Sequence, residues 1–257
     1  MQRIESGKNK GIGTGMLYIW AMVFTSCGII GGGIVQNGIL EIGNLQTDQL
    51  LQKIQTSSWA MTAATIALLM QAIETCAIPA FAMLIIQKMH DQEGLPDFGT
   101  ALAVALISEI PYDLVFSGKI NDMESQNPAL GIVIAVLVLY FWKRYQNQNI
   151  QNFMIKAAVL IAGMVWVTML QIRHGAFLLI MLSVLWAFRS RPLMRNFLGP
   201  VVGVICSILS PFYLASPMGF LLIHFYNGEK SEETQKAKFF VYPTILLIVG
   251  IISTFIL

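Results

Sequence analysis

Long apolar runs separated by short polar segments dominate the chain, a pattern typical of membrane-spanning helices. A transmembrane helix needs about 20 predominantly apolar residues. The candidate runs are residues 16–40, 59–87, 98–117, 129–142, 153–172, 175–188, 197–214, 218–226 and 239–257. The run 218–226 has about half the length that a crossing needs, so it either begins earlier or is re-entrant. We therefore expect an all-α fold, a polytopic transmembrane helical bundle of about eight or nine spans.

Glycines and prolines mark the places where these spans should pack closely or bend. The spacing of Gly28 and Gly32 favours the close approach of another helix. The run 59–87 is too long for an untilted crossing, and Pro79 predicts a kink within it. Pro111 removes the donor for the Ile107 carbonyl, so we expect a kink or break there, with the Ser108 hydroxyl as a substitute donor.

Composition agrees with the hydrophobic pattern and excludes two other classes of protein. Hydrophobic residues make up 56% of the 257 residues and charged residues 12%, which excludes a disordered chain. The net charge of +2 and the lack of a Lys/Arg run argue against nucleic-acid binding. The three cysteines are far apart, without metal-ligand spacing, so no metal is expected.

The positive charges predict the orientation of the chain. With nine spans and a cytoplasmic N-terminus, most Lys and Arg residues fall on the cytoplasmic side, and only Lys53, Lys119 and Arg173 fall outside. We therefore expect a multi-pass protein of the cytoplasmic membrane. Residues 1–15 are predicted to be a flexible cytoplasmic lead-in, and residues 16–257 a single transmembrane helical domain.

The stretch ALISEIPYDLVFSGK, residues 105–119, places carboxylates in a segment that is otherwise apolar enough for a bilayer. A charged group at that depth costs roughly 2.5 to 3.5 kcal/mol or more, so such groups are functional candidates. Glu109 and Asp113 are four residues apart and would share one face of a regular helix, where they repel unless a proton, a cation or a basic side chain intervenes. This stretch is the first candidate site.

Other ionisable residues fall in or near predicted spans. Arg173 and His174 would lie at the outer surface, where Arg173 either forms a structural ion pair with Asp113 or Glu109 or takes part in acid–base chemistry. Glu74 either binds a cation or proton or stays protonated in a hydrogen bond to a neighbouring helix, and His224 faces a similar choice. His90, at the end of the second span, is a candidate general base or an ordinary solvated histidine.

Three sequence elements resemble the TraX family of polytopic membrane proteins, named for the conjugal-transfer protein that acetylates pilin N-termini. They are ALISEIPYDLVFSG followed by Gln126-Asn127, HFYNGEK (224–230) followed by KFFVYP (238–243), and the apolar IPAFAMLII before His90. Together they cover roughly residues 78–142 and 218–257.

The resemblance implies transfer of an acyl group from acetyl-CoA or another cytoplasmic acyl-CoA to an amine or hydroxyl at the membrane. Its implied acceptor is a peptide or a pilin-like substrate. Membrane lipids and a membrane protein are the other expected partners, and the charge pattern already argues against nucleic acid. The implied catalytic residues are Glu109 and Asp113, with His90 as the base. The expected substrate-binding residues are Glu74, Tyr112, Gln126, Asn127, Arg173, His224, Asn227 and Tyr242.

The chain departs from the family pattern at two places. The first span has neither the Asp nor the His of the family's first helix, and Thr244 rather than a His follows Pro243. These departures motivate an alternative, a non-catalytic membrane subunit of the same fold that binds a peptide, a lipid or a protein partner. A third alternative is a small transporter in which Glu74, Glu109 and Asp113 form an ion path.

Overall fold

The structure is a computed structural model that describes residues 11–40, 47–91, 98–145, 149–228 and 240–255. Within these ranges the chain forms helices and short connections, together with two isolated β-bridges. The all-helical prediction is therefore confirmed. In chain order the helices are α1 (Thr14–Ile30), the π-helix η1 (Gly31–Ile39), α2 (Thr47–Thr56), α3 (Ser58–Glu74), α4 (Ala77–Asp91), α5 (Phe98–Phe116), α6 (Pro128–Arg144), α7 (Ile150–Met169), α8 (Gly175–Ala187), α9 (Pro192–Cys206), the 3-10 helix η3 (Pro211–Met218), α10 (Gly219–His224) and α11 (Val241–Phe255).

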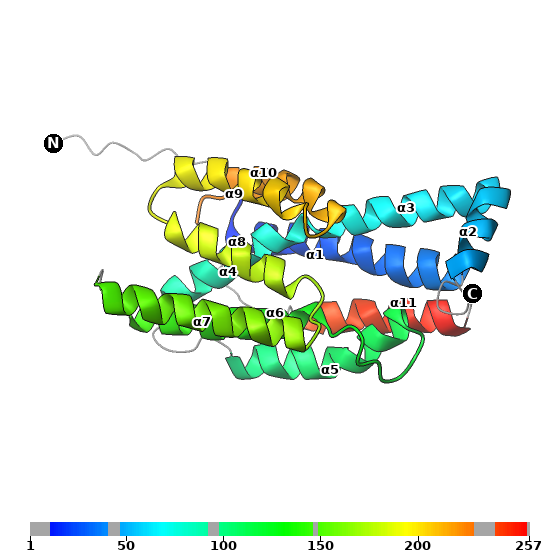
Figure 1. The fold of residues 1–257 in the computed structure, drawn as a ribbon, viewed down its shortest axis with the longest axis horizontal. Helices are drawn as coiled ribbons and strands as arrows, with labels where there is room; N and C mark the ends of the chain where they lie inside the picture. Colours follow the sequence, from blue (N-terminus) through cyan, green and yellow to red (C-terminus); the bar gives the residue numbers. More distant parts are fainter. Residues whose placement is uncertain (1–10, 41–46, 92–97, 146–148, 229–239, 256–257) are drawn as a thin grey trace.

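The helices form an elongated bundle whose two ends are built from different parts of the chain (Figure 1). Helices α1, α3 and α11 extend toward the end that carries α2. Helices α4, α6, α7, α8, α9 and α10 lie toward the other end. Helix α5 packs along α11 and α6, and α1 packs along α3 and α4. The turn between α7 and α8 comes to the middle of the bundle, where the two halves meet.

Several helices have the length and composition of membrane spans. Four helical stretches are long and apolar enough to cross a membrane: Thr14–Gln36, Ser58–His90, Phe98–Phe116 and Ile150–Met169. Shorter apolar helices are Gly175–Ala187, Pro192–Cys206 and Val241–Ser253. The outer face of α7 carries large exposed apolar side chains, including Phe153, Ile161 and Trp166. Such a surface suits a lipid environment and confirms that this is a helical membrane protein. The cytoplasmic orientation of the N-terminus stays a prediction.

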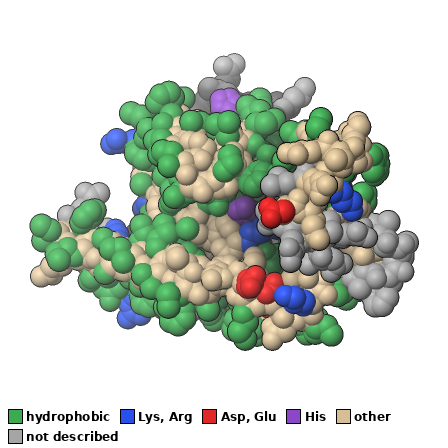
Figure 2. All heavy atoms as spheres, turned by 45° about the vertical axis from the view of Figure 1, so that its right-hand side comes forward, with side chains coloured by type: hydrophobic (Ala, Val, Ile, Leu, Met, Phe, Trp, Pro, Cys, Tyr) green, Lys and Arg blue, Asp and Glu red, His purple; other side chains and the backbone are tan. Residues whose placement is uncertain are grey.

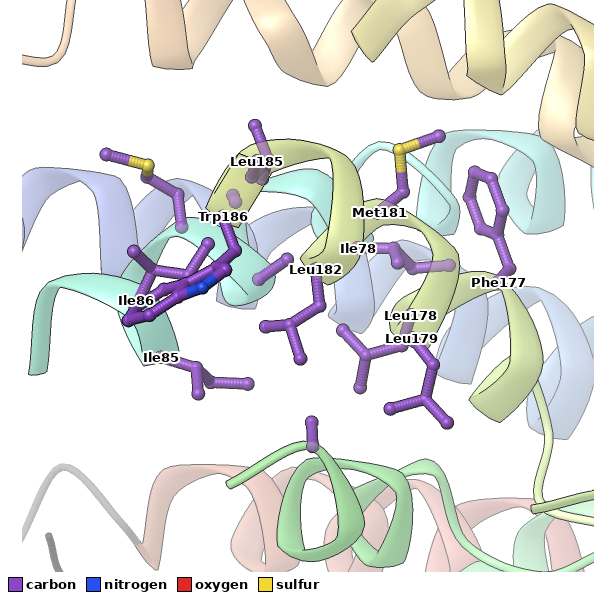
Figure 3. Close-up of a cluster of buried hydrophobic side chains, with 14 of the residues drawn as sticks. Ile78, Ile85, Ile86, Phe177, Leu178, Leu179, Met181, Leu182, Leu185 and Trp186 are labelled. Atoms are coloured by element: carbon purple, nitrogen blue, oxygen red, sulfur yellow. The ribbon is translucent and has the colours of Figure 1, made fainter. Parts of the chain in front are cut away.

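Helix α8 is the centre of the main hydrophobic core. Its side chains are apolar all round, and a helix of that kind is buried within a bundle. Phe177, Leu182 and Leu185 are fully buried against Ile78 and Ile86 of α4 (Figure 3). Because α8 is held so firmly, the turn that precedes it has a fixed position.

The long second run divides into α3 and α4 at Thr75 and Cys76, one turn before Pro79. A proline ring collides with the carbonyl four residues earlier and offers no N–H to it, so the helix is interrupted on the N-terminal side of Pro79. The Thr75 hydroxyl donates to the carbonyls of Ala72 and Phe212 at this break. The predicted bend is confirmed, and it exposes a helix end, Glu74, in the middle of the bundle.

Pro111 does not break its helix, so of the two expected outcomes the break is wrong and the kink stays a prediction. Helix α5 continues from Phe98 to Phe116 with Pro111 inside it. The Ser108 hydroxyl donates to the carbonyls of Val104 and Ala105, not to the Ile107 carbonyl that Pro111 leaves without a donor. Packing along α11 and α6 maintains the helix across the missing hydrogen bond.

The short eighth run begins earlier than residue 218, the first of the two alternatives. After α9 the chain turns at Ser207–Ser210 and returns along α9 as η3 and α10. Together η3 and α10 form one helical arm, Pro211–His224, with a 3-10 start. Pro217 within this arm cannot donate a backbone hydrogen bond, which favours the irregular geometry.

Glycines in the first span allow close helix contacts, as the sequence predicts. A Cβ atom on Gly28 would lie 2.2 Å from the Glu74 carboxylate, and one on Gly32 would lie 2.2 Å from the Phe116 ring. The span itself changes from α-helix to π-helix at Gly31. Most of the predicted lead-in, residues 1–15, lies outside the described residues. However, Ile12 is bridged to Tyr226, and α1 begins at Thr14, so the end of this segment is anchored.

Candidate functional site

A group of polar side chains lies where the two halves of the bundle meet, and we call it the central polar cluster. It contains the last residue of α3, the turn before α8, one face of α5, the residue that caps α6, one residue of η3 and the start of α11. Its members are Glu74, Glu109, Tyr112, Asp113, Asn127, Arg173, His174, Tyr213 and Tyr242. Seven of these nine residues were predicted as site residues from the sequence, and they come from five separate segments.

Glu74 and Arg173 form a buried ion pair at the centre of the cluster. Arg173 Nη2 lies 2.9 Å from Glu74 Oε2, and the side chains are 18% and 8% exposed respectively. One prediction is corrected here, because Arg173 pairs with Glu74 and not with Asp113 or Glu109. Gly28 provides the space for the Glu74 carboxylate on the side of α1.

The turn between α7 and α8 directs Arg173 into the bundle. Gln171 and His174 both adopt left-handed backbone conformations, with φ of 51° and 59°. Positive φ is uncommon for residues other than glycine, and it reverses the chain within a few residues. The turn is fixed from outside by backbone hydrogen bonds with Gln126, whose N–H donates to Gln171 O and whose carbonyl accepts from Arg173 N. Gln126 thus positions Arg173 through its main chain and is not itself in the cluster.

His174 is a member of the cluster that the sequence marked as an ionisable candidate but did not assign as a catalytic or substrate-binding residue. Arg173 Nε donates to His174 Nε2 at 3.3 Å, so that ring nitrogen is an acceptor. His174 Nδ1 is then the donor to the Tyr213 hydroxyl, 3.1 Å away. The Tyr213 ring stacks on Phe177 with centroids 4.0 Å apart. The sequence signal for His174 was its position between two apolar runs, next to Arg173.

Two aromatic side chains of α5, Phe116 and Tyr112, connect this helix to the ion pair. The Arg173 guanidinium lies over the Phe116 ring, 4.5 Å from its centroid, in a cation–π arrangement. The Phe116 ring in turn contacts the Tyr112 ring at 4.7 Å. Tyr112 is 1% exposed, and its hydroxyl lies 3.0 Å from the Ser125 hydroxyl. Tyr112 also interacts electrostatically with Arg173.

Asn127 and Tyr242 connect the two parts of the chain that carry the family resemblance. Asn127 caps α6 by accepting from Ala129 N at 2.9 Å, and Tyr242 donates to the same Asn127 oxygen at 2.8 Å. The Asn127 backbone N–H also points to Glu109 Oε1 at 3.4 Å. The start of α11 is therefore attached to the start of α6 and to α5 at the cluster.

Glu109 and Asp113 each have one buried oxygen atom that lacks a hydrogen-bond partner among the described residues. These atoms are Glu109 Oε2 and Asp113 Oδ1. The other Asp113 oxygen, Oδ2, accepts from the backbone N–H of Asp122 at 2.9 Å. Buried polar atoms are nearly always hydrogen-bonded, and those that are not call for a specific explanation. A bound group with N–H or O–H donors would satisfy both oxygens.

Three predicted site residues lie away from the central polar cluster. His90 is exposed in the last turn of α4, roughly 20 Å of helix from the α3–α4 break. His224 ends α10 and lies 3.3 Å from the side-chain amide of Asn196. Asn227 donates its backbone N–H to Ile12 O. A role for His90 as the base beside Glu109 and Asp113 does not fit this arrangement.

One face of the bundle has a depression that contains charged side chains (Figure 2). Figure 2 shows a depression in a largely hydrophobic face, in which acidic, basic and histidine side chains are visible together. Around the cluster and elsewhere in the described residues, no group of three or more His, Cys, Asp or Glu side chains could hold a metal ion. The carboxylate, tyrosine and arginine side chains of the cluster can transfer protons and form hydrogen bonds.

Comparison with known proteins identifies one family. The family model described as "TraX protein" matches residues 65–253, which include every member of the central polar cluster. No curated protein and no solved structure matches the chain.

Proposed function

Because this chain belongs to the TraX family, we propose that it is an integral membrane acyltransferase. It moves an acetyl or other acyl group from an acyl-CoA thioester to a peptide amine or another acceptor at the membrane. The observation that carries the proposal is a pair of buried carboxylate oxygens in the cluster, Glu109 Oε2 and Asp113 Oδ1, for which the described residues provide no hydrogen-bond partner. They are acceptors in a buried place, and an amine or hydroxyl of the acceptor supplies the donors that they lack.

The reaction requires one proton to leave the acceptor and one to reach the leaving thiolate. The acceptor nitrogen or oxygen attacks the thioester carbonyl, a C–N or C–O bond forms, and the C–S bond breaks. Glu109 or Asp113 takes the proton of the attacking group as general base. The same proton, or one from the solvent, neutralises the departing CoA thiolate, so atoms and charge balance without any further reactant.

Such a site also needs a positive charge and hydrogen-bond donors, and Arg173 and the tyrosine hydroxyls supply them. As negative charge develops on the thioester oxygen, a hydroxyl donor beside a cation stabilises it. Tyr112 is that kind of donor, because it adjoins Ser125 and interacts with Arg173. Arg173 is fixed by Glu74 and Phe116, so its charge has a constant position relative to α5. Glu74 is a positioning residue in this scheme.

The test is acyl transfer by the purified protein in proteoliposomes. Acetyl-CoA and a hydrophobic peptide with a free N-terminal amine serve as probes, with thiol release and acetylated peptide mass as readouts. The variants are Glu109→Gln and Asp113→Asn, and the matched control is Glu124→Gln, an exposed carboxylate in the same loop region. Loss of transfer in both cluster variants, with full transfer in the control, supports the proposal. Undiminished transfer in both cluster variants rejects the assigned roles.

A non-catalytic function of the same site remains as the alternative, and one observation favours it. The hydrogen bonds of the Glu109 and Asp113 carboxylates within the described residues come from the backbone N–H groups of Asn127 and Asp122 and not from a histidine. The cluster would then bind a peptide, a lipid or a partner without chemistry. A partner that co-purifies with the wild type but not with the Glu109→Gln variant, in protein that releases no thiol from acetyl-CoA, would establish this alternative.

A further inference from the structure

A second polar region lies at the opposite end of the helical arm formed by η3 and α10. At one end of this arm Tyr213 contacts His174 of the central polar cluster. At the other end Tyr226 lies beside the first turn of α9. Residues 213 to 226 span roughly 20 Å of helix axis, so the two regions are separate. The second region contains part of the HFYNG element, which the proposed reaction does not use.

Arg195 is the charged residue of this region, and it is buried without an ionic partner. It is 8% exposed. Its Nε donates to Asn196 Oδ1 at 3.2 Å, and its Nη1 lies 3.8 Å from Met83 Sδ. Both partners are neutral. Within the described part of the chain, no carboxylate forms a salt bridge with Arg195, in contrast to Arg173, which is paired with Glu74.

A buried charge without a counter-charge is costly, so its presence needs a reason. A guanidinium has five N–H donors, and the two contacts above use two of them. The remaining donors form a fork that matches the oxygens of a phosphate. Arg195 therefore has both the charge and the hydrogen-bonding capacity left over for an anion.

The neighbouring side chains are hydrogen-bonding groups of the kind that accompany phosphate. Tyr226 interacts electrostatically with Arg195, and its hydroxyl lies 3.1 Å from Thr14 Oγ1. On the outer side, the Asn196 amide faces the exposed His224 ring. The backbone pairing of Ile12 with Phe225 and Asn227 fixes these groups relative to one another.

Several basic side chains among the described residues lie at the same end of the bundle. Lys143 donates to Met89 O, so the ends of α6 and α4 are adjacent. Arg189 follows the end of α8, and Arg191 is the N-cap of α9, four residues before Arg195. Clustered positive charges raise the local concentration of anionic ligands.

We propose that Arg195, with Tyr226, Thr14 and Asn196 around it, binds the phosphate group of a ligand. The phosphate belongs either to a soluble nucleotide-type molecule such as coenzyme A or to the headgroup of an anionic phospholipid. The site lies apart from the central polar cluster and depends on Arg195. Where the ligand is coenzyme A, the inference rests on the proposed reaction, in which coenzyme A carries the acyl group.

The experiment measures binding of coenzyme A and of inorganic pyrophosphate to the full chain in nanodiscs of phosphatidylcholine. Arg195→Leu removes the buried charge, and Arg191→Leu removes an exposed charge from the same helix end. We expect saturable binding that Arg195→Leu weakens by at least about tenfold, while Arg191→Leu leaves it nearly unchanged. An equal loss in both variants, or none in either, would overturn the site.

Lipid composition separates the two sources of phosphate. If the site takes a headgroup, adding phosphatidylglycerol to the nanodiscs raises the unfolding temperature of the wild type, but not that of Arg195→Leu, and it competes with pyrophosphate. If the site takes a soluble ligand, phosphatidylglycerol has no such effect, and coenzyme A binds in both bilayers.

The unfolding temperature without ligand tests whether Arg195 is only structural. Replacing an unpaired buried charge by leucine leaves the ligand-free protein as stable as the wild type or more stable. A clear fall in unfolding temperature for Arg195→Leu, without loss of phosphate binding, would show that the arginine holds the fold and binds no anion. Loss of acyl transfer with phosphate binding intact would instead bear on the central polar cluster alone.

Discussion

Arg173 and Glu74 lie 99 positions apart in the sequence, yet their side chains meet at 2.9 Å in the middle of the bundle. Glu74 lies at the break between α3 and α4, and Arg173 lies in a turn in which Gln171 and His174 have left-handed backbone conformations. The pair connects α3 to the α7–α8 turn, and through the Phe116 ring it also contacts α5. Each half of the bundle therefore contributes one charge to a single interaction.

Breaking this pair from one side should be more harmful than removing it altogether. Arg173→Met leaves the Glu74 carboxylate buried without a counter-charge, which costs about 3–5 kcal/mol of stability. The double variant Glu74→Met with Arg173→Met removes both charges and should recover much of that loss. Thermal unfolding in detergent of the wild type, the single variants Glu74→Met and Arg173→Met and the double variant gives the coupling between the two residues. Equal instability of the single and double variants would mean that the pair is not the source of the effect.

Gly28 should tolerate no side chain, because the Glu74 carboxylate occupies the space beside it. An alanine Cβ there would lie 2.2 Å from Glu74 Oε2 and 2.6 Å from Glu74 Cβ. Gly28→Ala should therefore lower the unfolding temperature and disturb the ion pair. The matched control is Gly99→Ala, since no atom lies within 4 Å of a Cβ at Gly99, and alanine favours helix. We expect this control to unfold at the wild-type temperature or slightly above.

Tyr242→Phe should reveal the strength of the contact between α11 and α6. The change removes only the hydroxyl that donates to Asn127 Oδ1 at 2.8 Å and leaves the ring in place. Because the Asn127 side chain is fully buried, we expect a loss of about 1–3 kcal/mol in the free energy of unfolding. Tyr140→Phe is a suitable control, because it also removes only a tyrosine hydroxyl. Tyr140 is a partly buried residue of α6 that lies away from this contact. A similar small effect in both variants would count against a special role for the Tyr242 hydroxyl.

The sequence predicted the class of fold and much of the cluster, because these follow from composition and local pattern. Apolar runs predicted helical spans, and a carboxylate within such a run predicted a polar site at Glu109 and Asp113. The partner of Arg173 was assigned wrongly, since the depth of Glu74 depends on the break before Pro79 and on the course of the turn at Gln171. Both are features of the tertiary structure, and the hydrophobic periodicity of the sequence does not predict them. His90 was predicted to be the base from the sequence around it, but it lies in the last turn of α4, away from the cluster.

The left-handed backbone conformation at Gln171 gives a last prediction, which tests the backbone of the α7–α8 turn and leaves the Arg173 and His174 side chains unchanged. Gln171 is exposed and has φ of 51°, a conformation that glycine adopts without steric cost. Gln171→Gly should therefore leave stability unchanged or raise it by up to about 1 kcal/mol, while Gln171→Val should lower it, because a β-branched residue is strongly disfavoured there. Both variants keep the backbone carbonyl that accepts from Gln126 N. If the valine variant unfolds like the glycine variant, the left-handed turn is not what holds Arg173 in the cluster.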